Sequence, residues 1–307
     1  HRGMDFTLET TSERTVQSER DIMPPETTVA LAWKQQDIEQ RFLFPGGRFT
    51  GVNTLFTTIV AAMLTVAFYG ILLLIPETLF ATMFTQRGPT PYAISFFSFW
   101  ALAILFVKWR KLVFQRKALK YSVVPTEHDF VLTQANVKTV MNNIYRTVDD
   151  PRHFVLFNRI TIALSNLSNL GRVSDLDDIL RSQASNDEDR MESSYLLLKG
   201  FVWAIPVLGF IGTVMGLSEA IGSFGSVLQT AAELSEIKLA LQGVTSGLAT
   251  AFQTTLEALV AALFIQIAMT FLKKNEEDFL DNCFDYCIRN VVNRLKMLHY
   301  DEAANES

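Results

Sequence analysis

The chain has 307 residues, of which 49% are hydrophobic and 19% are charged, and 24 of them are Phe. This composition is more apolar than that of an ordinary soluble domain of this length. The formal net charge is −5, and no basic tract outside residues 108–120 resembles a nucleic-acid-binding patch. We therefore expect an integral membrane protein that does not bind nucleic acid.

The first 50 residues are mostly polar and rich in Thr, Glu and Ser. They contain no short apolar core followed by a cleavage site, so we do not expect a signal peptide. We predict that residues 1–50 form an N-terminal segment that is partly flexible.

Two uncharged stretches follow. There are 28 consecutive uncharged positions between Arg48 and Glu77, and 20 between Arg87 and Lys108. Each is long enough to cross a hydrocarbon core of about 30 Å as a helix. We predict that residues 51–107 contain transmembrane helices one and two.

A second pair of apolar stretches lies in the last third of the chain. Residues 200–218 are uncharged, and residues 239–272 contain a single charge, at Glu257. We predict that residues 200–272 form transmembrane helices three and four. As one helix, residues 239–272 would be about 51 Å long, so both helices are expected to project beyond the bilayer.

Basic residues indicate the sidedness of these spans. They are concentrated in residues 108–120 and at Lys273 and Lys274, whereas Arg87 and Lys238 are the only basic residues in the two other connections. Basic residues near the end of a span are retained on the cytoplasmic side. We therefore expect a cytoplasmic helical insert at residues 108–199, a cytoplasmic amphipathic helix at residues 273–307, and both termini in the cytoplasm.

The remaining titratable residues do not suggest catalysis. Cys283 and Cys287 lie one helical turn apart, where we expect them to pack in a core, and the four His are scattered. No nucleophile, phosphate loop, metal-ligand cluster or carboxylate pair is recognisable. We expect neither an enzyme nor a metal or cofactor site.

Helices three and four each carry a stripe of small residues. On the third, Pro206, Gly209, Thr213 and Gly216 share a face, and Gly212 precedes Gly216 by four. On the fourth, the corresponding residues are Gly243, Gly247, Thr250, Thr254 and Ala258. Small residues at this spacing let helices approach closely in a membrane. The alternative is a contact within one subunit that has no further function.

The hydroxyl groups and one acid on these stripes suggest an ion path. Thr213 and Thr250 are expected near mid-bilayer depth, facing protein or water, although each could instead bond a carbonyl of its own helix. Thr254 and Glu257 are expected on the same face, with Glu257 near the cytoplasmic surface. Glu257 either touches the path or is a structural residue that pairs or hydrates.

One segment resembles a known family. Its residues match the signature P-x-(L/I)-G-x-x-G-T-V-x-G of the MotA/TolQ/ExbB proton-channel family, at Pro206, Leu208, Gly209, Gly212, Thr213, Val214 and Gly216. The segment "GLATAFQTTLEALVAAL" is similar to the last helix of that family, with Thr250 at its intramembrane threonine. The resemblance covers roughly residues 175–275.

This resemblance implies a homopentamer in the bacterial cytoplasmic (inner) membrane. The ring would hold a dimer of an ExbD/TolR/MotB-like partner, which has one span bearing an intramembrane Asp, and protons or sodium ions would drive rotation. The implied ion path comprises Thr213, Thr250, Thr254 and Glu257. The implied packing and pore residues are Pro206, Gly209, Gly212, Gly216, Gly243 and Gly247.

Two other functions remain open at this point. A structural membrane scaffold would use the stripes only to oligomerise and would be insensitive to the proton gradient. A self-contained channel would conduct without any single-span partner.

Overall fold

The computed structural model describes residues 30–86, 88–125, 132, 136–170, 174–230 and 234–295. The described residues are almost entirely helical, in the order α2 (Trp33–Gln36), α3 (Ile38–Arg41), α4 (Thr54–Leu74), α5 (Leu79–Thr85), α6 (Thr90–Ala118), α7 (Val137–Thr147), η1 (Pro151–His153), α8 (Val155–Leu170), α9 (Ser174–Ser194), α10 (Leu196–Thr230), α11 (Leu234–Cys287) and the π-helix η2 (Ile288–Val292). One isolated bridge joins Leu31 to Val148. The expected all-helical fold class is confirmed.

Four helices are long and apolar enough to cross a membrane, as expected. They are Thr54–Leu74, Thr90–Ala118, and the apolar parts of Leu176–Gly225 and Ile237–Leu295. Their outward side chains include Val66, Leu74 and Phe264, which are 74%, 81% and 68% exposed. Apolar surface on this scale is typical of a protein that faces lipid or other subunits. The chain is therefore a multi-pass membrane protein.

The α4 helix begins where its sequence supplies a cap. The side chain of Asn53 accepts hydrogen bonds from the backbone N–H groups of Leu55 and Phe56. Asn53 thereby satisfies donors that have no partner within the helix.

The α6 helix begins at Thr90 with a proline in its first turn and continues without a break past Lys108 to Ala118. Residue 107 was expected to be the boundary between the second span and the cytoplasmic insert. It lies inside one continuous helix, at the point where apolar residues give way to basic ones.

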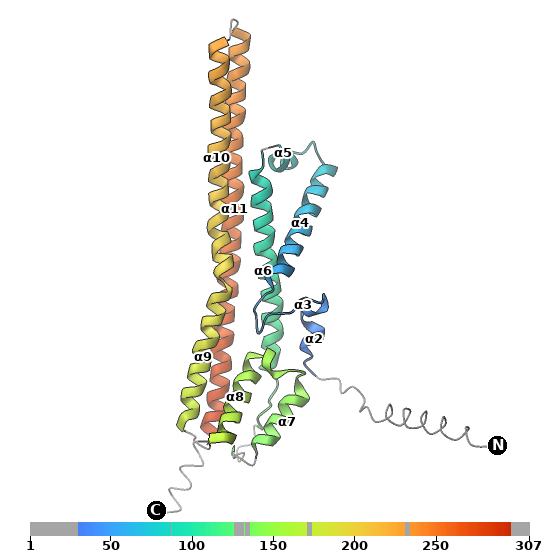
Figure 1. Cartoon of the computed structure of the whole chain (residues 1–307), viewed down its shortest axis with the longest axis vertical. Coiled ribbons are helices and arrows are strands. Elements are labelled where there is room, and N and C mark those ends of the chain that lie inside the picture. Colours follow the sequence, from blue (N-terminus) through green and yellow to red (C-terminus); the bar gives the residue numbers. More distant parts are fainter. Residues whose placement is uncertain are drawn as a thin grey trace, which may run out of the picture.

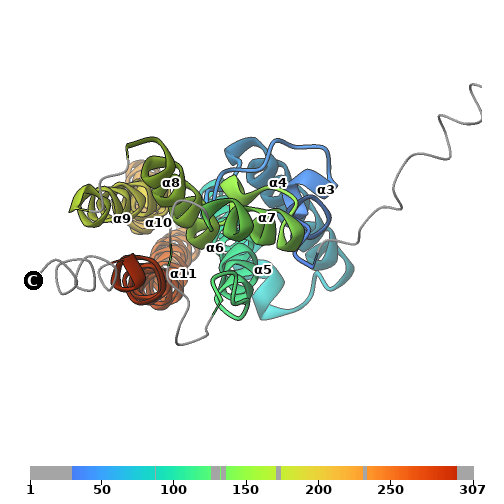
Figure 2. The ribbon, with the colours of Figure 1, turned by 90° about the horizontal axis from the view of Figure 1, so that it is seen from below.

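The α10 and α11 helices form an antiparallel pair that runs along the long axis of the molecule (Figure 1). The α4 and α6 helices lie beside this pair, and Figure 2 shows α6 between α4 and α11. The α5 helix joins α4 and α6 at one end, here called the α5 end, whereas α7 and α8 lie at the other, here called the α8 end. The α10–α11 pair continues past α5, because α10 and α11 have 35 and 54 residues whereas α4 has 21.

The helices that were expected to project into the cytoplasm extend to the α8 end of the molecule. The α9 and α10 helices are separated only by a turn at Tyr195, and α11 runs through Lys273 and Lys274 to Cys287. Most of the large buried side chains, including Phe154, Phe157, Ile160 and Phe279, gather here. Cys283 and Cys287 are free and buried in this core, as predicted.

Part of the expected N-terminal segment is ordered. Residues 1–29, predicted to be flexible, lie outside the described residues. Residues 31–53 pack on α6, and Trp33 is 1% exposed against Phe114 and Phe154.

Candidate functional site

The small-residue stripes of α10 and α11 face each other within one chain. A Cβ atom built on Gly209 would lie 2.5 Å from the Cβ of Ala258, and one built on Gly247 would lie 2.5 Å from the Cβ of Ala220. On Gly216 it would lie 3.3 Å from the carbonyl oxygen of Gly247. Gly209, Gly216 and Gly247 therefore lie at close contacts between α10 and α11 inside the subunit.

Gly212 and Gly243 have different surroundings. A Cβ atom on Gly212 would lie 2.8 Å from Thr90 Oγ1 of α6 and 2.9 Å from Thr254 Oγ1. Gly243 has no atom that close among the described residues, and it lines a cavity of about 350 Å³ with Gln86 and Glu219. Pro206 lies within α10. A role of these residues in a pore remains a prediction.

A cluster of four oxygen atoms lies between α10 and α11. The hydroxyl of Thr213 contacts that of Thr255, and it lies 3.2 Å from the carbonyl oxygen of Gly209 and 3.1 Å from that of Ala251. Thr255 Oγ1 lies 3.0 Å and 3.3 Å from the same two oxygens. The four oxygen atoms share only two hydroxyl protons. Lone pairs on these oxygens therefore remain available to bind water or a cation.

Thr255 is the residue that the sequence analysis missed. Thr250, which was expected near the same depth as Thr213, lies in α11, but its side chain is outside the described part. Thr254 was expected on this face; it is 1% exposed, its Oγ1 lies beside Gly212 of α10, and it donates to the carbonyl oxygen of Ala251 at 3.0 Å. The sequence has two adjacent threonines, Thr254 and Thr255, and it does not show which of them points toward Thr213.

Glu257 lies apart from this oxygen cluster. It lines a cavity of about 390 Å³ with Phe68 of α4, Phe80 and Phe84 of α5, and Phe99 of α6. Among the described residues, its Oε1 atom is shielded and has no hydrogen-bond partner. Its contact with α5 places it toward the α5 end.

The depth expected for Glu257, near the cytoplasmic surface, remains a prediction. It was counted from Ala240 as the membrane edge, whereas the loop before α6 meets α10 and α11 near Gly216 and Gly247. Ten residues separate Gly247 from Glu257, which corresponds to about 15 Å along a helix. Participation of Glu257 in an ion path remains a prediction.

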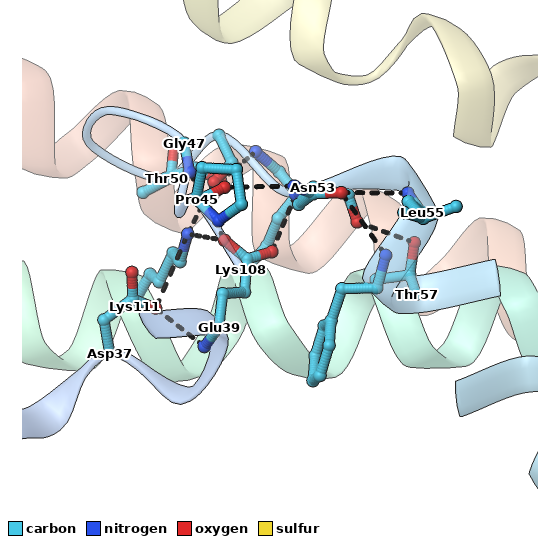
Figure 3. Close-up of polar contacts among 12 residues, drawn as sticks. Asp37, Glu39, Pro45, Gly47, Thr50, Asn53, Leu55, Thr57, Lys108 and Lys111 are labelled. Atoms are coloured by element: carbon cyan, nitrogen blue, oxygen red, sulfur yellow. Dashed lines mark hydrogen bonds and ion pairs between the residues drawn. The ribbon is translucent and has the colours of Figure 1, made fainter. Parts of the chain in front are cut away.

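Two buried lysines of α6 form a second polar site (Figure 3). Lys111 Nζ lies 2.5 Å from Glu39 Oε2, 2.7 Å from the carbonyl oxygen of Gly51 and 3.6 Å from Asp37 Oδ1. Glu39 also accepts from the backbone N–H of Asn53 at 2.7 Å. Burial raises the pKa of Asp37, and Lys111 opposes that rise only in part. These contacts hold residues 37–53 against α6.

Lys108 connects further elements. Its Nζ atom lies 2.8 Å from Ser194 Oγ and 3.4 Å from Glu276 Oε2, above the ring of Tyr195. Glu276 accepts from Tyr195 at 2.8 Å and also from Thr50. One buried carboxylate thus contacts the N-terminal segment, α6 and the junction between α9 and α10.

The sequence analysis treated Lys108 and Lys111 only as basic residues flanking a span. Their spacing could have indicated a shared polar face of the helix, because Lys108, Lys111 and Gln115 recur at three and four residues. All three are buried in the structure. A second internal pair joins Arg159 to Asp187 at 2.7 Å. Within the described residues, no group of three or more His, Cys, Asp or Glu could hold a metal ion.

One region of the chain matches a known protein family. Residues 155–283, which contain the end of the cytoplasmic insert predicted from sequence together with α10 and most of α11, match the MotA/TolQ/ExbB proton channel family. No curated protein and no solved structure matches the chain.

Proposed function

We propose, because residues 155–283 match the MotA/TolQ/ExbB proton channel family, that this chain is a member of that family and the pore-forming ring subunit of an ion-driven rotary motor. Five copies surround a dimer of a single-span ExbD/TolR/MotB-like protein in the bacterial inner membrane. Proton or sodium flow turns one component against the other. The termini and the α8 end face the cytoplasm, because the basic residues at 108–120 and 273–274 are near that end.

The observation that carries this proposal is the oxygen cluster of Thr213 and Thr255. It puts hydroxyl and carbonyl oxygens inside an otherwise apolar helix pair, where a polar group needs a partner. Such oxygens can replace part of the water around a passing ion. Thr250, Thr254 and Glu257 are retained as further proposed members of the path.

A single chain leaves apolar faces of these helices uncovered. Phe210, Val214 and Phe252 are 64%, 51% and 63% exposed on α10 and α11. In the proposed ring, neighbouring copies and the helix of the partner cover these residues. The four predicted spans contain one carboxylate, Glu257, and no Asp, so in this proposal the proton-binding Asp belongs to the partner.

The membrane potential provides enough energy for this mechanism. Each elementary charge that crosses supplies about 2.3 kcal/mol per 100 mV. A few protons per step therefore supply enough free energy to reorganise a helix interface.

The first test is composition. Complexes isolated from native membranes in mild detergent and weighed by native mass spectrometry are expected to contain five copies of this chain and two of a single-span protein. A monomer, or a ring that conducts protons without a partner, would contradict the proposal.

The second test is ion flow through that complex in liposomes containing a pH-sensitive dye. Replacing Thr213 and Thr255 together by Val should lower proton flux at least tenfold while the ring still assembles. Thr245→Val is the matched control, because Thr245 is exposed and bonds only to Leu241 of its own helix, at 2.9 Å. Unchanged flux in the double variant would favour a structural scaffold.

A further inference from the structure

An apolar groove lies between α6 and α11 on the outside of the molecule. Its volume is about 460 Å³, and its lining includes Phe106, Trp109 and Val113 of α6 and Ala268 and Phe271 of α11. Phe106, Trp109 and Phe271 are 54%, 50% and 68% exposed. The groove is separate from both the threonine cluster and the cavity beside Glu257.

The groove changes from apolar to basic along one face of α6. Phe106, Trp109, Val113 and Arg116 recur at three or four residues on α6 and are exposed, and the exposed Lys120 follows in the turn after the helix. Aromatic side chains followed by basic ones are typical of the level at which a helix leaves the hydrocarbon core. The apolar part of the groove is therefore at acyl-chain depth and its basic end is at headgroup depth.

Arg116 is fixed at the basic end. Its Nη2 atom donates to the carbonyl oxygen of Asn275 at 2.8 Å and to Asn275 Oδ1 at 3.0 Å. The ion pairs found among the described residues include neither Arg116 nor Lys120.

The acid that follows Asn275 on the same face of α11 is already paired. Asp278 follows Asn275 by three residues, and its carboxylate lies 3.0 Å from Lys274 Nζ. The end of the groove therefore carries a net positive charge that can bind an anion.

We propose that this groove binds a phospholipid with an anionic head, of the phosphatidylglycerol class. One acyl chain lies along Phe106, Trp109 and Phe271, and the phosphate lies at Arg116 and Lys120. The remaining donors of the Arg116 guanidinium, on Nη1 and Nε, and a second cation favour a phosphodiester. A zwitterionic lipid is disfavoured because it would bring an ammonium group close to the same two cations.

Such a lipid would link two helices that are already joined elsewhere. The buried pair between Lys108 and Glu276 connects α6 to α11 on another face of α6, since Lys108 is 1% exposed and Trp109 is 50% exposed. A lipid in the groove would add a second connection. This inference does not depend on the proposed motor function.

The test uses the full-length protein in nanodiscs of phosphatidylcholine and phosphatidylglycerol in a 3:1 ratio. Tracer lipids of each head class carry a diazirine in one acyl chain, and labelled residues are identified by mass spectrometry after illumination. The phosphatidylglycerol tracer is expected to label Phe106, Trp109 and Phe271 several-fold more than the phosphatidylcholine tracer.

Three variants separate the contributions. Replacing Arg116 and Lys120 by Gln should reduce labelling by the anionic tracer to the level of the zwitterionic one, whereas Lys138→Gln, at an exposed site on α7, should change nothing. Ala268→Trp should fill the groove and remove labelling by both tracers.

Equal labelling by the two head classes, or labelling that is insensitive to loss of Arg116 and Lys120, would overturn the proposal. So would an unlabelled groove, because another chain would then cover it. Normal lipid labelling in the Thr213→Val/Thr255→Val variant is expected whatever its proton flux, which separates this test from that of the motor.

Discussion

Lys108 Nζ lies 3.4 Å from Glu276 Oε2, and the two side chains are 1% and 3% exposed. Removing one partner of such a pair leaves the other charge buried without compensation. Because Glu276 also accepts hydrogen bonds from Tyr195 and Thr50, its loss affects four segments at once.

Glu276→Gln is therefore expected to lower the free energy of unfolding by about 3–5 kcal/mol. The measurement is denaturant unfolding in mixed micelles, with Glu277→Gln as the control. Glu277 is a partly exposed neighbour whose recorded ion pair is with Lys273 at 3.6 Å, so its replacement should cost at most about 1 kcal/mol. Equal effects of the two substitutions would show that the buried pair contributes little.

Asp37 and Glu39 are two buried acids near one lysine, and we expect opposite responses to their neutralisation. Burial raises the pKa of Asp37, so its folded form holds a proton more tightly than its unfolded form. Its contribution to stability is then full below its unfolded pKa of about 4 and is lost as pH rises. Asp37→Asn should equal or exceed the wild type in stability at pH 7, and this advantage should vanish near pH 4.

Glu39→Gln should instead destabilise the protein by about 3 kcal/mol or more, because Lys111 loses its closest carboxylate. Unfolding free energies between pH 4 and pH 7 compare both variants with the wild type. A destabilised Asp37→Asn at pH 7 would mean that its attraction to Lys111 outweighs the cost of burial.

Gly247 and Gly243 lie one turn apart on α11 but differ in their surroundings. A Cβ atom on Gly247 would come within 2.5 Å of the Cβ of Ala220, whereas one on Gly243 meets no described atom within 4 Å. Gly247→Ala should therefore destabilise the α10–α11 pair by about 1–3 kcal/mol. Gly243→Ala should be neutral or stabilising by about 0.5–1 kcal/mol. Unfolding of the two variants, measured under the same conditions, checks the difference, and equal stability would contradict this packing.

Much of the fold could be predicted from charge and composition. The uncharged stretches located the four spans, and the small residues of α10 and α11 predicted a close helix pair. The periodicity of a helix shows which residues share a face, but it does not identify the helix that the face meets. This is why the sequence alone did not show that Thr213 contacts Thr255.

The polar contacts were harder to predict for a related reason. Lys111 and Glu39 are 72 residues apart in the chain. Seen alone in the sequence, each looks like an ordinary charged residue exposed to solvent. The loop between α5 and α6 lies beside Gly247, and only the folded chain brings these two segments together.

The continuity of α11 has a mechanical consequence. The helix runs for 54 residues from Leu234 to Cys287 with no proline, so it is about 80 Å long. A rod of this length acts as a lever: a tilt of about 1° at one end displaces the other by about 1.4 Å, given the helix rise per residue. A small change in helix tilt beside Thr255 therefore moves the core around Cys283, because α11 has no break between these residues.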